Sequence, residues 1–136
     1  MDLARTLGIT AGSRIALIDS PVRFGEDLSL PADVESLTLD DPSLDCVVLF
    51  VKTRAALDEM VVAAARVLAP TGTLWVAWPK QLSGYATDMS IEAAQASGMR
   101  LGLLDTRRMS LNDAWTAIRF IVRLDDRETW AKRSFD

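Results

Sequence analysis

Three short apolar runs divide this chain, and each has the length and composition of a strand that is buried on both faces. They span residues 14–19, 46–51 and 73–78. Strands of this kind occur in parallel sheets, where crossover helices cover both faces. Between the second and third runs, apolar residues recur at helical spacing over residues 54–69, after the N-cap residue Thr53. The alternation of strand and helix therefore predicts an α/β domain with a mostly parallel sheet.

Weaker signals fill the rest of the chain. Capping residues, prolines and glycines mark the expected ends of the remaining helices and strands. The predicted helices are helical turns at 3–7 before Gly8, a short helix after Ser20-Pro21 that Pro31 stops, and a helix from Ser90 to Ser97 before Gly98. The predicted strands span 34–39, 101–109 and 116–124. Pro70 and Gly72 are expected to end the helix over 54–69. The last two strands are joined by so few residues that they should form an antiparallel pair.

The chain has 136 residues, which is enough for one compact domain and too few for two. We assign residues 1–124 to this domain. Residues 125–136 form a polar tail that contains Trp130 and Phe135. The tail could be a terminal helix, a docking segment or disorder, and the domain is expected to stay folded without it.

Composition excludes several functional classes. The chain has no histidine and a single cysteine, Cys46, so histidine-based catalytic pairs, disulfides and cysteine-rich metal sites are absent. We expect no metal and no bound cofactor. The net charge of −4, from 15 basic and 19 acidic residues, argues against nucleic acid as a partner. No secretory signal or membrane-spanning run is found in the sequence, which predicts a cytoplasmic protein without a membrane partner.

A resemblance extends over about residues 7–124. The residues that carry it are Leu7-Gly-Ile with Ala11-Gly, the run from Arg14 to Pro21, Leu49-Phe-Val51, the run from Leu74 to Lys80, Ser83-Gly84 with Thr87-Asp88, and Trp115 with Arg119-Phe120. In these stretches the chain resembles an uncharacterised bacterial family, a domain of unknown function. The resemblance implies a Rossmann-like fold and supplies no activity. The antiparallel C-terminal pair is typical of the methyltransferase type of this fold. We therefore expect about six strands, with one helix-strand unit lost before the Cys46 strand.

The loop after the first strand departs from the methyltransferase pattern. In that fold the strand is followed by Asp-x-Gly-x-Gly-x-Gly, which lets S-adenosylmethionine (SAM) lie against the backbone. Here the corresponding residues are Asp19-Ser20-Pro21-Val22-Arg23-Phe24-Gly25, and only the last glycine is present. Asp40 or Asp41 lies near the position of the acid that takes the ribose hydroxyls, although a turn also explains this pair. The usual SAM loop is therefore predicted to be broken.

Candidate ligand-binding residues gather where the parallel strands end. Ligands of open α/β sheets bind outside the carboxyl ends of the strands, near helix N-termini. The predicted site residues are Asp19, Ser20, Lys52, Lys80, Ser83, Thr87, Asp88 and Trp115. The lysines suit a small anionic ligand, and Arg23 could assist them. The structural alternatives are helix capping by Ser20, and for Asp88 either capping or pairing with Lys80.

Three functions remain open at this stage. The first is a methyltransferase-like domain with a broken SAM loop that binds a small anionic ligand. The second is a SAM-dependent methyltransferase with an altered loop. The third is a non-catalytic protein-interaction module, including a homodimer formed through an edge strand or the tail. No catalytic residue can be assigned, because one fold of this kind hosts many functions.

Overall fold

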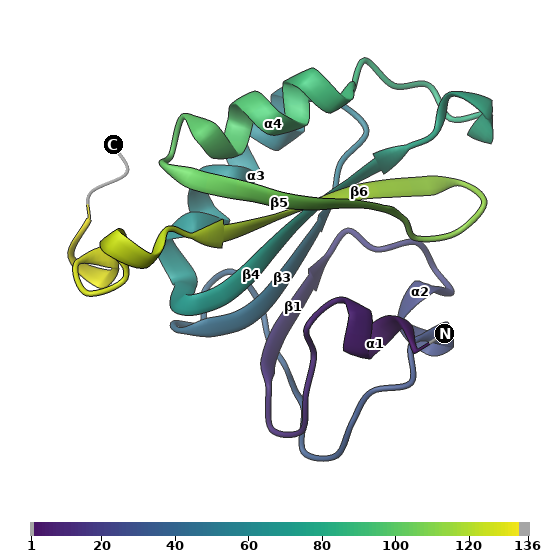
Figure 1. The fold of residues 1–136 in the computed structure, drawn as a ribbon. Coiled ribbons are helices and arrows are strands. Elements are labelled where there is room, and N and C mark those ends of the chain that lie inside the picture. The colour runs from purple at the N-terminus through teal and green to yellow at the C-terminus, as the bar shows by residue number, and fades with distance from the viewer. Residues whose placement is uncertain (1, 134–136) are drawn as a thin grey trace.

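The computed structural model describes residues 2–133, and its six strands form one sheet. The strand order is β2-β1-β3-β4-β6-β5 (Figure 1). The strands are β1 (Arg14–Ile18), β2 (Glu35–Ser36), β3 (Leu44–Phe50), β4 (Leu68–Pro79), β5 (Leu103–Ser110) and β6 (Trp115–Val122). Strands β1 to β4 are parallel, and β6 is antiparallel to both of its neighbours. This confirms the mostly parallel sheet with an antiparallel C-terminal strand.

Helices cover both faces of the sheet, to different extents. They are α1 (Leu3–Thr6), α2 (Phe24–Asp27), α3 (Arg54–Val67) and α4 (Ile91–Met99), with short 3-10 turns η1 (Gln81–Ser83), η2 (Leu124–Asp126) and η3 (Trp130–Lys132). In Figure 1, α3 and α4 lie on one face and the short α1 and α2 on the other. Strand β3 follows β2 directly, so one helix-strand unit of the methyltransferase type of fold is missing there, as the sequence pattern predicted.

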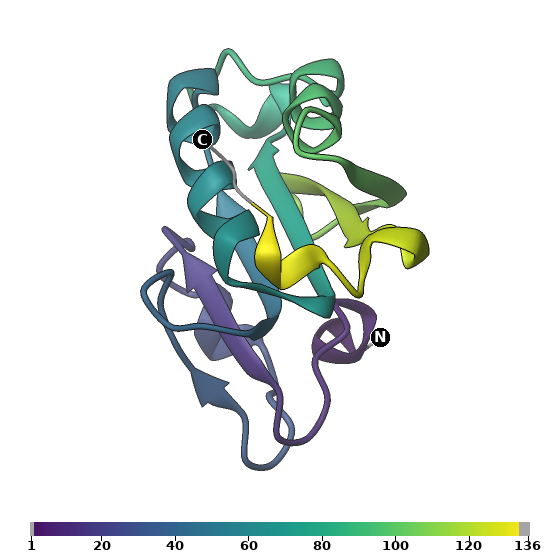
Figure 2. The same cartoon turned by 90° about the vertical axis from the view of Figure 1, so that its left-hand side faces the viewer.

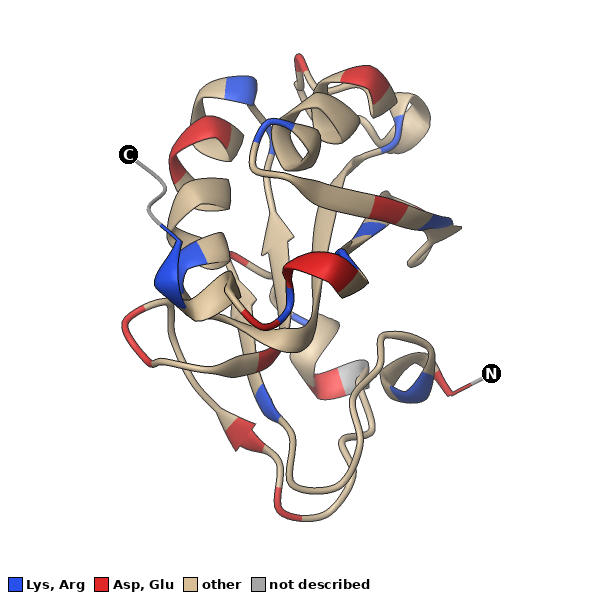
Figure 3. Ribbon diagram, turned by 60° about the vertical axis from the view of Figure 1, so that its left-hand side comes forward, with Lys and Arg blue, Asp and Glu red and all other residues tan. Residues whose placement is uncertain are grey.

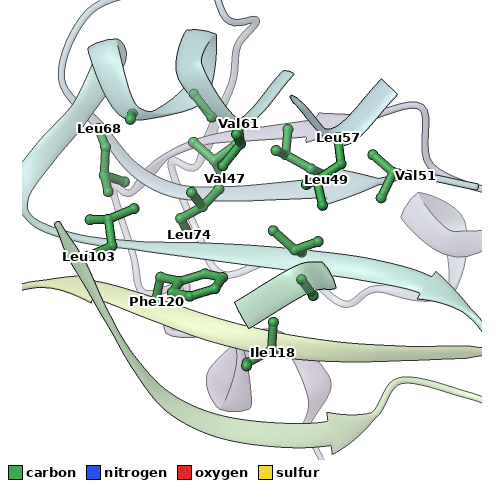
Figure 4. Close-up of a cluster of buried hydrophobic side chains, with 14 of the residues drawn as sticks. Val47, Leu49, Val51, Leu57, Val61, Leu68, Leu74, Leu103, Ile118 and Phe120 are labelled. Atoms are coloured by element: carbon green, nitrogen blue, oxygen red, sulfur yellow. The ribbon is translucent and has the colours of Figure 1, made fainter. Parts of the chain in front are cut away.

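The larger apolar core lies between α3, α4 and the sheet. Figure 4 shows Val47 and Leu49 of β3, and Val51 directly after the strand, beside Leu57 and Val61 of α3. These five side chains are almost completely buried. Alternate side chains of the strand share one face, and the apolar face of the amphipathic helix packs against it. This contact fixes the helix on the sheet. The second core holds α1 and α2 against the opposite face and includes Trp75.

Several predicted boundaries were wrong. Strand β4 starts at Leu68 and contains Pro70 and Gly72, which were expected to lie outside it. The register with β3 shifts here, so that Leu44 pairs with Leu68 but Cys46 pairs with Thr73. This irregularity accommodates a proline, which has no N–H to donate to a sheet.

The loop after β1 and the strand after it were also misjudged. Ser20 does not cap a helix, because α2 begins only at Phe24. The residues between them form a turn, in which the amide of Phe24 donates to the carbonyl of Pro21. The strand expected at 34–39 shrinks to residues 35–36. Gly98 lies inside α4 rather than after it. Its missing side chain makes room for the ring of Phe120.

The tail packs on the domain over its described part. Trp130 is 2% exposed, and its indole Nε1 donates to the carbonyl oxygen of Leu68 at 3.0 Å. Figure 2 shows the yellow C-terminal segment close to the end of α3 and the start of β4. Of the three possibilities for the tail, the docking segment is therefore the one found over its described residues, 125–133. Residues 134–136, with Phe135, lie outside the described part of the chain.

Candidate functional site

The carboxyl ends of β1, β3 and β4 meet at one edge of the sheet. Asp19, Lys52 and Lys80 follow these three strands directly or after one residue. The chain passes from β1 to β2 on one side and returns to β3 on the other, so the ends of β1 and β3 form the switch point where open α/β sheets bind ligands. Asp19 has a left-handed backbone, with φ of 57°. Such a conformation is uncommon in a residue other than glycine and is frequent at functional sites.

A small hollow of about 270 Å³ opens at this switch point, and we call it the switch-point hollow. Asp19, Lys52 and Trp115 line it, together with Phe50 and the start of α3. The rings of Phe50 and Trp115 pack edge to face, with centroids 5.3 Å apart. Trp115 is therefore mostly a wall of the hollow, since its side chain is buried. Three of the eight predicted site residues come together here.

Tyr85 contacts two residues that line the hollow, Lys52 and Trp115, and was missed by sequence reasoning. Its ring lies 5.7 Å from the ring of Trp115, and the Lys52 ammonium lies 4.5 Å from its centroid. A cation placed over a ring face is attracted to it electrostatically. The only signal in the sequence is an aromatic residue within a polar loop, and nothing in that pattern indicates which cation it would meet.

Lys80 holds a turn together. Its ammonium donates to the Ser110 hydroxyl at 2.6 Å and to the Asn112 carbonyl at 2.7 Å. The Asn112 side chain in turn accepts from the amides of Ala114 and Trp115. Lys80 thus links the end of β4 to the β5–β6 turn. It is half-buried, and two of its three N–H donors are used inside the protein.

Asp88 and Thr87 fix the start of α3. The Asp88 carboxylate accepts from the Arg54 amide at 2.8 Å, and the Thr87 hydroxyl donates to the Lys52 carbonyl at 2.7 Å. A carboxylate at this place offsets the partial positive charge of the helix N-terminus. Of the two structural alternatives for Asp88, capping is therefore the one found, and within the described residues no ion pair joins Asp88 to Lys80.

A larger cleft of about 820 Å³ lies next to the hollow, between the end of β4, the start of α4 and the β5–β6 turn. We call it the α4 cleft. Lys80 and Thr87 line it. Ser20, Ser83 and Asp88 line neither the hollow nor the cleft, although all three lie in loops at the same edge of the sheet. The predicted site residues therefore divide between two neighbouring depressions.

Asp40 and Asp41, the two candidates for an acid that binds ribose hydroxyls, have different hydrogen-bond partners. The Asp41 carboxylate accepts from both the amide and the hydroxyl of Thr38, at 2.9 and 3.3 Å. This is a turn motif that needs no ligand. Asp40 is exposed, and its amide donates to the Thr38 hydroxyl. Neither residue lines the hollow.

Within residues 2–133, no group of three acidic or cysteine side chains is placed to hold a metal ion. No helix in that range combines the length and apolar character needed to cross a bilayer.

Cys46 is expected to be chemically inert in the folded protein. Burial raises the pKa of its thiol from 9.0 to about 12, and its Sγ lies 3.5 Å from the carbonyl oxygen of Leu7. Since the thiolate is the reactive form, a disulfide reagent at pH 8 should label Cys46 only when the protein unfolds. The stability that the buried thiol contributes is complete below pH 9 and is lost as the pH rises from 9 toward 12. Rapid stoichiometric labelling of the native protein, compared with labelling in urea, would contradict this.

Comparison with known proteins supports the fold. No protein-family model and no curated protein matches the sequence. Among solved structures, the N-methyltransferase NodS from Bradyrhizobium japonicum has a TM-score of 0.56 and 11% identity over 87% of this chain and 90% of that one. A TehB-like SAM-dependent methyltransferase from Corynebacterium glutamicum has a TM-score of 0.51 and 9% identity over 90% and 88%.

The cyclopropane synthase MmaA2 from Mycobacterium tuberculosis has a TM-score of 0.54 and 14% identity. The match covers 80% of this chain and 61% of the synthase, so the chain spans less than two thirds of that protein. These similarities show that the chain has the methyltransferase-like Rossmann fold. The predicted fold class is thereby confirmed, whereas the resemblance to a bacterial family stays a prediction.

Proposed function

We propose that this methyltransferase-like domain binds a small molecule through a negatively charged group in the switch-point hollow, and that it does not hold SAM in the usual way. The observation that carries the proposal is the position of Lys52, whose exposed ammonium lies at the edge of a depression at the topological switch point. Open α/β sheets bind their ligands at this point. The small volume of the hollow favours a small anion or a charged group of a larger molecule.

Among Lys52, Arg54 and Lys80, Lys52 is the one whose side chain makes no hydrogen bond within the described residues. Lys80 donates to Ser110 and Asn112, and the Arg54 side chain donates to the Asp88 carbonyl. Within the described residues, the one electrostatic contact of the Lys52 ammonium is with the ring of Tyr85. Because this ammonium makes no hydrogen bond to a described protein acceptor, it has donors available for an anion. Asp19, which lines the same hollow, can accept hydrogen bonds from hydroxyl groups of the same ligand.

The loop after β1 supports the part of the proposal that concerns SAM. Pro21 and Arg23 occupy positions where glycines let a cofactor approach the backbone, and α2 has only 4 residues. A SAM-dependent methyltransferase with an altered loop is the second candidate, favoured by the similarity of the fold to such enzymes. A protein-interaction module is the third, and the exposed side chains Val22 and Leu82 at this edge are in its favour. Basic and acidic residues are interspersed along the chain (Figure 3), which suits a small ligand better than nucleic acid.

The proposal predicts that inorganic phosphate or a mononucleotide raises the melting temperature. A ligand that binds only the folded state at ten times its dissociation constant stabilises it by about 1.4 kcal/mol. For a domain of this size that corresponds to a rise of roughly 3 to 6 °C. In isothermal titration, SAM and its demethylated product should show no binding tighter than about 100 µM. Tight binding of SAM would favour the altered-loop methyltransferase instead.

Two lysine variants separate binding from general salt effects. Lys52→Ala should lose the rise in melting temperature, whereas Lys132→Ala, which removes the same charge from the exposed tail, should keep it. Lys80→Ala is less suitable because Lys80 also holds the β5–β6 turn. All measurements need equal ionic strength, since excluded anions stabilise any protein. Equal rises in the wild type and both variants would overturn the proposal and leave the interaction module ahead.

A further inference from the structure

We infer that the α4 cleft is a second binding site, selective for a small molecule that combines a cationic amine with an apolar body. The cleft is about three times as large as the switch-point hollow, at about 820 Å³ against about 270 Å³. Its volume is within the range of typical small-molecule sites, about 300 to 1,000 Å³. In Figure 1 the segment between β4 and α4 and the β5–β6 turn lie at the same end of the sheet. These segments form the walls of the cleft.

The apolar lining comes from three elements. Trp78 and Pro79 at the end of β4 are buried, and Met89 and Ile91 at the start of α4 are half-buried. Leu82, on the loop between them, is fully exposed although it lines the same cleft. A ligand with an apolar body would cover Leu82 and the exposed parts of Met89 and Ile91. Removing such surfaces from water is the general source of affinity in sites of this kind.

The polar lining indicates the charge of the ligand. Most of its polar side chains are already used inside the protein. The Lys80 ammonium has two acceptors. The Thr87 hydroxyl donates to the Lys52 carbonyl and accepts from the Met89 amide. The Thr116 hydroxyl donates to the Met109 carbonyl. The Ser90 hydroxyl caps α4. These groups need no ligand to satisfy them.

Two carboxylates and the side-chain amide of Gln81 remain available. Glu92 and Asp113 both line the cleft, and both are exposed. Within residues 2–133, neither side chain takes part in a hydrogen bond or an ion pair. They come from different elements, since Glu92 is in the first turn of α4 and Asp113 is in the β5–β6 turn. Carboxylates only accept hydrogen bonds when ionised, and with Lys80 the described lining carries two negative charges and one positive, so it suits a donor with positive charge. Trp78 adds an aromatic ring, which also favours a cation.

The inference is tested with three probes that share one apolar body and differ in charge. These are 2-phenylethylamine, 2-phenylethanol and phenylacetate. Binding is followed by the NMR signal of the Trp78 indole, assigned with Trp78→Phe. We expect saturable shifts with the amine, with a dissociation constant on the order of 1 mM. The alcohol should bind more weakly, and phenylacetate should bind least.

Matched carboxamide variants identify the groups responsible. Glu92→Gln and Asp113→Asn should each weaken binding of the amine by roughly two- to five-fold, as expected for an exposed charge pair. Glu59→Gln, which changes an exposed carboxylate outside the cleft, should leave the affinity unchanged. The inference is overturned if phenylacetate binds as well as the amine, if the Glu92 and Asp113 variants bind the amine like the wild type, or if no probe shifts the Trp78 signal. Phosphate binding at Lys52 is a separate result that this experiment does not affect.

Discussion

Replacing Trp130 with alanine is expected to lower the free energy of unfolding by about 3 to 5 kcal/mol, the usual cost of removing a buried large aromatic side chain. Trp130 is buried in the larger core, and its indole donates to the backbone of Leu68. The variant leaves a cavity and also leaves the Leu68 carbonyl without this donor. Thermal unfolding should show a melting temperature lower by about 10 to 20 °C.

A second residue of the tail provides the control. Leu124 is 75% exposed, so Leu124→Ala should change stability by no more than about 0.5 kcal/mol. Trp130→Phe should have an intermediate effect, because it keeps most of the apolar contact and loses the hydrogen bond. A tail that does not pack on the domain would make Trp130→Ala as mild as Leu124→Ala.

Deleting residues 125–136 should leave a domain that still unfolds cooperatively, since the sheet is complete without them, but that unfolds at a lower temperature.

Gly98→Ala is expected to destabilise the protein by about 1 to 3 kcal/mol, although alanine is the better helix former. A Cβ atom at this position would lie 2.3 to 2.6 Å from three ring atoms of Phe120. Phe120 is fully buried on β6, so its ring cannot move away without disturbing the core. The overlap therefore outweighs the gain of about 1 kcal/mol that alanine normally brings to a helix. Urea unfolding of the variant measures the difference.

A second helical glycine tests the explanation. Nothing lies within 4 Å of a Cβ built on Gly25 in α2, so Gly25→Ala should be neutral or stabilise by up to about 1 kcal/mol. Adding Phe120→Leu to Gly98→Ala should cost less than the sum of the two single changes, because the smaller side chain makes room for the Cβ. Additive effects in the double variant would show that contact with Phe120 is not the cause.

The amino-acid sequence by itself determined the class of fold and the edge of the sheet at which the parallel strands end. Strand β3 and helix α3 are the clearest cases, because continuous burial and helical periodicity are local patterns that need no knowledge of distant residues. Once a parallel sheet is accepted, the ends of its strands must lie at one edge. The common location of Asp19, Lys52 and Lys80 follows from that rule alone.

The tertiary structure decided which partner each residue has. Periodicity indicates which face of a helix or strand is buried, but it does not say what packs there. The bond from Trp130 to Leu68 spans 62 residues, and the bond from Arg54 to Asp88 spans 34. Such contacts determine that Trp130 belongs to the core, that Asp88 caps α3 and that Tyr85 meets Lys52. They depend on how the whole chain closes around the sheet, and no local pattern contains that information.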